Sequence, residues 1–474
     1  MHLFLMKSKF AIPVLMLLLF PGILAAQGYY NRENFGNRSL LLSGNVTGSV
    51  EDLGLTYYNP ARIALVEAPS FSINAKAYQV SSLSLKNAFG RDEKLRDSRF
   101  EGVPSLLAGT FNIDKWEKHH FAYAFLSKQR QRLSISAENN VSEGDLIDDN
   151  EGLESLVSRL DLDNSETDEW FGLTWGMKLR ENLSIGVSAF ASVYNFRAKY
   201  DLRLAGLEEN QDVKFYNNLV NFGQTSYGMF WKVGLAWKVK DLDLGINLDL
   251  PYLEVINDGK FSQSRFLSGY GEGDDVYSYG NLKGIDSKRK VPFSVSFGAG
   301  IPWKKNKFHL KVDWHGSVSE YDRLVIPSFE NGSGEIEEFS FKEALRSIIN
   351  FGVGGEFFLS EKVDLFASFS TDYSPLKSNA SIFDLIGDGE TDININADFM
   401  HYGMGVDLKF KRARITVGGT YSHGSGNFMR PGYFPAPDED EFSGNENTAT
   451  VSVSRWRVIV GLEFPIFGYE VNIK

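Results

Sequence analysis

The feature that most constrains the fold is a strict alternation of apolar and polar residues that recurs along the chain. Residues 227–239 show it clearly, with Tyr227, Met229, Trp231, Val233, Leu235, Trp237 and Val239 on one face and, apart from Phe230, small or polar residues on the other. A period of two residues indicates an extended strand with one apolar face and one polar face. The alternation therefore predicts a mostly β protein with amphipathic strands.

The alternating segments come in pairs, joined by short charged turns. These turns centre near Glu181, Asp241, Lys305, Glu361 and Arg412. The connections between successive pairs are long, polar and acidic, and they cover about 198–224, 251–288, 321–345, 375–397 and 425–447. A soluble β-sandwich would have loops of mixed length at both ends. Short turns on one side and long loops on the other are typical of an outer-membrane barrel.

Counting the alternating segments predicts an all-β fold, a transmembrane antiparallel β-barrel of about fourteen strands. We expect the first five strands at 69–86, 103–112, 118–137, 168–180 and 182–197, and the last at 449–464. An even number of strands places both termini on the periplasmic side. We expect residues 153–160 to form a short helix within an extracellular loop.

The N-terminus resembles a targeting signal. Two lysines precede an apolar run over residues 11–20, and small residues follow, so residues 1–27 are expected to be a secretory signal peptide. The chain has no cysteine and therefore no disulfide framework. Its net charge of -12 argues against nucleic acid as a partner.

Residues 28–68 lie between the signal peptide and the first strand, and they show no alternation. They cannot face lipid, because unpaired backbone groups in hydrocarbon cost several kcal/mol each. They either hang in the periplasm or plug the lumen. Glycine pairs on the inner face of several strands leave room for a plug, at 172 and 176, 298 and 300, 352 and 354, and 403 and 405. The alternative role of these glycines is barrel curvature. We expect a plug at 28–68 and a barrel at 69–474.

The stretch "GNRSLLLSGNVTGSVEDLGLTYYNPARIAL" resembles the N-terminal hatch of the FadL/TodX (OmpP1-type) family of outer-membrane transporters. Asn59, Pro60 and Ala61 match the Asn-Pro-Ala motif that ends the family's hatch. The resemblance implies a fourteen-stranded barrel with a hatch in its lumen, which carries long-chain fatty acids or aromatic hydrocarbons. It also implies sideways exit at a kink in the third strand. This sequence departs from the family at that point, because residues 111–143 contain no glycine or proline and the third strand therefore has no obvious kink residue to support sideways exit.

An amphipathic substrate would need aromatic side chains and cations in the lumen. The alternation places seven candidate contacts there, namely Phe190, Tyr194, Phe230, Lys232, Lys311, Arg455 and Arg457. Inward carboxylates also occur, and such charges can instead form structural pairs across the wall.

No catalytic cluster, metal site or cofactor motif is recognised. The oxygen-rich stretches "DLDNSETDE" and "DLIGDGETD" lack EF-hand spacing, and we expect them in extracellular loops. The sequence therefore predicts a non-enzymatic, monomeric transporter. Its partners are a hydrophobic small molecule and the outer-membrane lipids, including lipopolysaccharide. The alternative function is that of a FadL-like barrel serving as a partner or shuttle in a secretion system.

Overall fold

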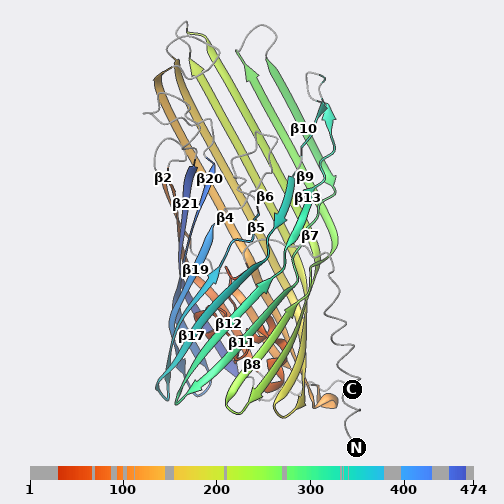
Figure 1. Ribbon diagram of the computed structural model, residues 1–474, viewed down its shortest axis with the longest axis vertical. Helices are drawn as coiled ribbons and strands as arrows, with labels where there is room; N and C mark the ends of the chain where they lie inside the picture. Colours follow the sequence, from red (N-terminus) through yellow and green to blue (C-terminus); the bar gives the residue numbers. More distant parts are fainter. Residues whose placement is uncertain are drawn as a thin grey trace, which may run out of the picture.

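The computed structural model is a closed antiparallel β-barrel (Figure 1). It describes residues 30–66, 70–86, 93–99, 104–111, 113–144, 154–207, 211–269, 275–330, 334, 336–339, 341–377, 397–429 and 448–465. The expected signal peptide and the end of the chain after residue 465 lie outside these residues. The barrel closes where β1 (Ser70–Lys86) pairs along its length with β21 (Thr448–Pro465). Closure gives the backbone groups of both strands partners, as the bilayer requires.

Fourteen wall strands form the barrel when segments that continue one another are joined. Three wall positions are each shared by two segments. β2 and β3 share one, since both pair with β1, and β8 and β9 share the next, since both pair with β7. β10 and β11 share the third, because β10 pairs with β9 and β11 pairs with β8. The bounds in wall order are β2 (Glu93–Arg99), β3 (Pro104–Phe111), β4 (His119–Gly144), β5 (Glu154–Arg180), β6 (Leu183–Leu207), β7 (Val213–Val239), β8 (Leu242–Asp249), β9 (Leu253–Ser268), β10 (Val276–Ile285), β11 (Ser294–Trp303), β12 (Asn306–His315), β17 (Ile348–Ser360), β18 (Val363–Asp372), β19 (Asp398–Lys409) and β20 (Arg414–Met429). The predicted barrel of about fourteen strands is confirmed.

Small elements complete the fold. A 3-10 turn, η2 (Asp114–Trp116), lies before β4. Two short sheets follow β12, one of β13 (Val318–Leu324) with β16 (Phe341–Leu345), the other of β14 (Phe329–Glu330) with β15 (Ile336–Glu337). The five predicted charged turns all lie where expected, at one rim, and β1 begins and β21 ends beside them. Both ends of the barrel chain are therefore periplasmic.

Four strands are much longer than a bilayer needs. The expected loop at 198–224 is wrong, because β6 and β7 continue through most of it. The expected helix at 153–160 is also wrong, since β5 begins at Glu154 and includes the "DLDNSETDE" stretch. These extensions form a tall wall on one side of the barrel (Figure 1). Their inward side chains, such as Leu160, Leu202 and Phe222, are buried in one apolar cluster with Phe341 of β16, so strand pairing continues past the membrane.

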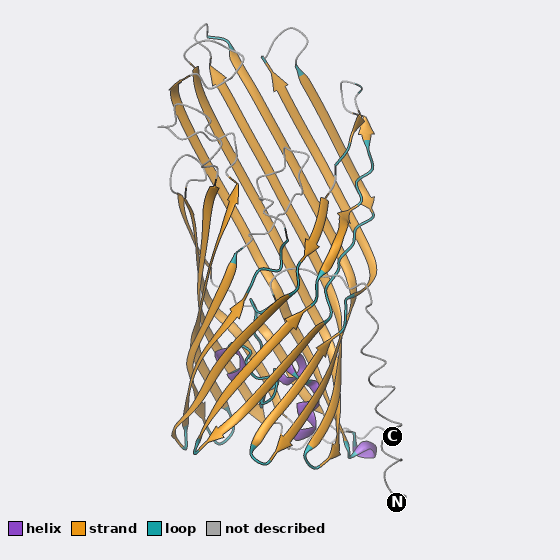
Figure 2. Ribbon diagram, in the orientation of Figure 1, coloured by secondary structure: helices purple, strands orange, loops and turns teal. Residues whose placement is uncertain are grey.

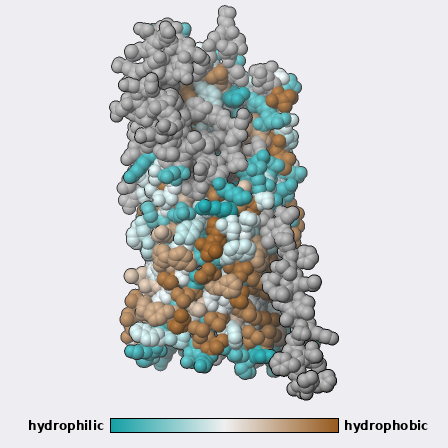
Figure 3. Space-filling model, in the orientation of Figure 1, coloured by the Kyte–Doolittle hydropathy of each residue, from teal (hydrophilic) through white to brown (hydrophobic). Residues whose placement is uncertain are grey.

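A band of exposed apolar side chains surrounds the periplasmic half of the barrel. Phe171, Leu173, Trp231 and Trp237 are each more than a third exposed, with Leu173 at 62%. Figure 3 shows this band on one face, above the polar turns. So large an apolar belt is stable only against lipid. No helix among the described residues is long and apolar enough to cross a membrane. The chain is a multi-pass outer-membrane barrel.

Residues 30–66, here called the inner segment, lie inside the barrel. The inner segment contains α2 (Arg38–Leu41), α3 (Leu55–Tyr58) and η1 (Pro60–Leu65), drawn in purple in Figure 2. The η1 turn packs against β5, β6 and β7, while α2 packs against β18, β19 and β20. Most of the segment's side chains are buried, including Phe35, Leu41 and Leu55, which have no measurable exposure. The lumen is therefore filled by protein at its periplasmic end.

Wall glycines make room for the inner segment. A Cβ at Gly186 would lie 2.5 Å from the carbonyl carbon of Pro60, and one at Gly405 would lie 2.5 Å from Leu41. Of the eight glycines singled out from the sequence, seven face the inner segment in this way. Gly172 is the exception, since its Cβ would meet Phe190 of the neighbouring strand. Close backbone approach explains these glycines better than curvature does.

The Asn-Pro-Ala motif joins the inner segment to the wall. Asn59 is extended, and its side-chain oxygen accepts a hydrogen bond of 3.1 Å from the backbone N–H of Ala61. Its Nδ2 donates to the carbonyls of Thr47 at 2.8 Å and Leu235 at 3.1 Å. Pro60 occupies the first position of η1, where a backbone N–H would have no acceptor within the helix, so the lack of an N–H in proline costs no hydrogen bond. One side chain thus links two parts of the inner segment to β7.

We expect Gly186→Val to expel η1 from the wall while leaving the barrel closed, because the new side chain would occupy the space of Pro60. Limited proteolysis of the folded protein should then cut within residues 30–66. Gly223→Val is the matched control, since a Cβ there meets only Lys260, at 3.4 Å. Equal protease resistance in both variants would contradict the proposed role of Gly186.

Candidate functional site

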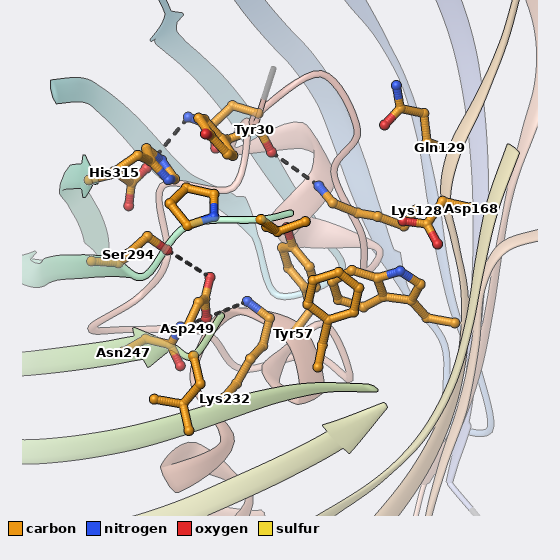
Figure 4. A pocket seen from close by; sticks show the side chains of 18 of the residues that line it. Tyr30, Tyr57, Lys128, Gln129, Asp168, Lys232, Asn247, Asp249, Ser294 and His315 are labelled. Atoms are coloured by element: carbon orange, nitrogen blue, oxygen red, sulfur yellow. Dashed lines mark hydrogen bonds and ion pairs between the residues drawn. The ribbon is translucent and has the colours of Figure 1, made fainter. Parts of the chain in front are cut away.

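A cavity lies between the inner segment and the inner face of the barrel wall (Figure 4). Its floor includes Tyr30 and Tyr57 of the inner segment. Its walls come from strands far apart in sequence, and the lining side chains include Lys128, Asp168, Trp170, Phe230, Lys232, Asp249, Arg289, Lys311, Asp313, His315, Arg323 and Glu343. The barrel closes these strands around one space, so aromatic and charged side chains face one another.

Aromatic rings form one side of the cavity. Trp170 stacks on Phe230 with ring centroids 4.1 Å apart, and Tyr57 lies 6.0 Å from Trp170. Tyr252 extends the cluster, 4.7 Å from Phe230. Burial raises the pKa of Tyr57 to about 12, so its hydroxyl stays neutral. This side of the cavity can hold an apolar group.

Three cations of the cavity are neutralised by a carboxylate within bonding distance. Lys232 lies 2.6 Å from Asp249, and Lys311 lies 2.7 Å from Asp313. Arg289, on the segment between β10 and β11, lies 2.6 Å from Asp168 of β5. Such pairs satisfy one another, so they hold the wall together and leave little charge for a ligand.

Lys128 differs from the other cavity lysines. Its Nζ donates a hydrogen bond of 3.1 Å to the backbone carbonyl of Tyr30 and lies 5.1 Å from the ring centroid of Tyr57. Within the described part of the chain, no carboxylate lies within 4.0 Å of it. A lysine that faces a cavity without a carboxylate partner is suited to an anionic group on a ligand.

Lys128 faces the cavity at a β-bulge, after which the inward face of β4 changes from even to odd positions. The pairing of β4 with β5 shifts register between Ser127 and Gln129, so Lys128 is the extra residue. The strand has no glycine or proline here, and a bulge needs neither. The sequence does carry a signal for it. Apolar residues point outward at odd positions up to Phe125, whereas the odd positions Ile135 and Ala137 are buried inside.

The described pairing of β4 with its neighbour on the β3 side ends near Lys128. β3 pairs with β4 only as far as Leu106 and Leu126. β2 continues the same wall position and pairs with β1, yet no pairing between β2 and β4 occurs among the described residues.

The structure places the seven candidate contacts in three groups. Phe230, Lys232 and Lys311 line the cavity. Phe190 and Tyr194 lie behind this lining. The ring centroids of Phe190 and Trp170 are 5.5 Å apart, and the Tyr194 hydroxyl accepts a hydrogen bond of 2.6 Å from Arg323.

Arg455 and Arg457, the third group, lie away from the cavity. Both pair with Glu33 of the inner segment, and Arg457 also donates to the carbonyl of Arg32 at 3.1 Å. They therefore hold the inner segment in place. Sequence analysis missed Lys128, Arg289 and Arg323; Arg323 lies in the expected extracellular loop 321–345, and Arg289 follows directly after the expected loop 251–288.

A second set of ion pairs ties the inner segment to the wall near the periplasmic rim. Glu51 lies 3.3 Å from Arg38 and 2.7 Å from Lys307 of β12. Lys307 also pairs with Asp243 at 2.8 Å, and Asp243 with Arg62 at 3.4 Å. Burial opposes ionisation of Glu51, yet Arg38 and Lys307 hold its pKa well below the usual range. These ion pairs thus connect the inner segment to β12 and β8.

Replacing Glu51 with Gln should loosen the inner segment without opening the barrel. Hydrogen exchange of the amides of α2 and α3 should accelerate, while that of β5 and β6 should not. In the wild type, the depressed pKa keeps Glu51 ionised below the pH at which an unfolded glutamate is protonated. Protection should therefore persist at pH 4 and be lost only at lower pH. Unchanged exchange in the variant would contradict this role.

Comparisons with known proteins bear on the fold. No family model matches the chain, and no curated protein matches it. Among solved structures, a Pseudomonas aeruginosa FadL homologue is 11% identical with a TM-score of 0.55, covering 92% of this chain and 100% of that one. The P. putida toluene transporter TodX is 13% identical with a TM-score of 0.51 and the same coverage. The CymD monoaromatic hydrocarbon channel is 11% identical with a TM-score of 0.51, covering 93% and 100%.

These likenesses define the class of the molecule. It is an outer-membrane β-barrel with the fold of the FadL/TodX transporters. The resemblance that the sequence suggested is confirmed at the level of the fold.

Proposed function

We propose that this protein transports hydrophobic compounds across the outer membrane through its lumen, with residues 28–68 as a hatch. Two observations support the proposal. The fold is shared with FadL homologues and hydrocarbon channels. The cavity also borders the inner segment, which occupies the path to the periplasm.

The cavity favours an amphipathic anion, such as a long-chain fatty acid, over a monoaromatic hydrocarbon. Lys128 carries this preference, because it faces the cavity without a carboxylate partner among the described residues. The stacked pair of Trp170 and Phe230 would receive the first part of the alkyl chain. A neutral hydrocarbon offers no anionic group to Lys128, so the lysine would contribute nothing to the affinity for such a ligand.

The bulge at Lys128 also suggests a route. A substrate whose head group binds Lys128 lies beside the stretch where β4 has no described partner on its β2 side. Its tail can leave sideways there, toward the hydrocarbon of the bilayer, without passing the inner segment. The ion pairs of Glu51 then act to keep the hatch closed during lateral exit.

Lys128→Gln should weaken binding of a labelled long-chain fatty acid to the purified full-length barrel by about tenfold or more, given that a hydrogen bond to a charged group contributes roughly 1.5–3 kcal/mol. Binding of a neutral alkylbenzene should change little. Lys178→Gln is the matched control, since Lys178 is an exposed lysine near the periplasmic rim.

Trp170→Ala provides the complementary test. It removes the aromatic surface and keeps the cation, so both the fatty acid and the alkylbenzene should bind more weakly. The proposal for the head group fails if Lys128→Gln leaves fatty-acid affinity unchanged. If neither ligand binds the wild type, the alternative of a partner or shuttle in a secretion system becomes the better account.

A further inference from the structure

The outward face of the tall wall carries cations in a single cross-strand row. Reading around the wall, Arg132 pairs with Ser165, Ser165 with Arg197, Arg197 with Gly223, Gly223 with Lys260, and Lys260 with Lys283. We call these six positions the basic row. It crosses β4, β5, β6, β7, β9 and β10 at one level, with small residues between the long cations.

The basic row lies just outside the apolar band. On β7, Tyr227 is the last outward apolar residue of the band and Gly223 lies four positions beyond it; on β6, Arg197 lies four positions beyond Val193. Four residues of a tilted strand rise about 10 Å. With the apolar band in the hydrocarbon, the row lies at the outer edge of the headgroup region of the outer leaflet. Long cationic side chains can also reach back toward the bilayer.

The row is unfavourable for the sheet itself. Lys260 and Lys283 are directly opposite one another, and like charges in that position destabilise a strand pair. Gly223 weakens the interior of β7. A Cβ added there would meet only Lys260, at 3.4 Å, so no close approach of another backbone requires glycine at this position. These features are explained if a ligand occupies the surface.

The protein's own carboxylates neutralise only part of the row. Arg132 pairs with Asp163 at 2.8 Å, and Lys260 lies 3.5 Å from Asp258. Within the described ranges, Arg197 and Lys283 have no carboxylate within 4.0 Å. Positive charge therefore accumulates around a shallow depression that Gly223 helps to line, although the chain as a whole carries a net charge of -12.

Three described strands on the opposite side of the barrel carry serines at this level instead of cations. On β20, β21 and β1, the outward positions at the corresponding height above Tyr421 and Trp456 are Ser425, Ser452 and Ser84, which pair in one register. These three strands therefore place no cation at this level among the described residues, although the register continues beyond Ser84 to Lys94 of β2.

We propose that the basic row is a binding site for the phosphorylated headgroup of a glycolipid in the outer leaflet. Five strand spacings of about 4.8 Å make the row roughly 24 Å wide, which suits a headgroup with more than one phosphate better than a single phospholipid phosphate. Arginine and lysine are the side chains that phosphate oxygens prefer. Directly below, the exposed Phe171, Tyr227 and Trp231 offer an apolar surface to the acyl chains.

The test measures binding of bisphosphorylated lipid A to the full-length barrel in nanodiscs of zwitterionic lipid. The triple variant Arg197→Gln, Lys260→Gln, Lys283→Gln should bind about tenfold more weakly or worse, because each cation near an anionic surface contributes about 1 kcal/mol. The matched control is Lys240→Gln, Lys304→Gln, Lys305→Gln, which removes the same charge from the periplasmic turns. It should bind within about twofold of the wild type.

A second variant keeps the result interpretable if the triple variant folds poorly. Gly223→Asp retains every cation and places a carboxylate in the row, and it should also weaken binding. Dephosphorylated lipid A should bind weakly to all forms, and millimolar inorganic phosphate should not displace lipid A from the wild type. The proposal is overturned if the triple variant binds as the wild type does, if the control variant loses as much affinity, or if phosphate removal has no effect.

Discussion

The ladder between β1 and β21 is the interaction on which the rest of the structure depends. Without it, two strand edges would face hydrocarbon with unpaired N–H and C=O groups, each costing several kcal/mol. Closure then creates an interior, and that interior must be either filled or made polar. The inner segment fills the periplasmic end, charged pairs fill the middle, and the apolar cluster around Phe222 and Phe341 fills part of the outer end.

The fit of the inner segment follows from backbone geometry. Wall glycines let Pro60, Leu41 and Gly48 approach the strands more closely than any side chain would permit. Asn59 and the ion pairs around Glu51 and Glu33 then satisfy polar groups that would otherwise be buried alone. The segment is thus held by many separate contacts and not by one continuous core, an arrangement in which parts can loosen independently.

The two faces of β4–β7 serve different environments. Inward side chains form the cavity and the apolar cluster, and outward side chains meet first lipid and then, four residues further, the surface where the basic row lies. The irregular point is Lys128, where the bulge reverses which side chains point inward. The reversal explains why the same strand presents Tyr123 to lipid and Arg132 to the outer surface while Lys128 faces the lumen.

Sequence alone determined the strand type, the short turns, the closed barrel and the inward direction of Phe230, Lys232 and Lys311, because alternation with a period of two is a local property of the chain. It did not determine where β6 and β7 end, since their extracellular parts have charged outward faces and resemble loops by composition. Nor did it separate Lys128 from Arg455 and Arg457. All three are cations on inner walls, and only the tertiary structure decides that Glu33 reaches the two arginines while the bulged lysine is left facing a cavity.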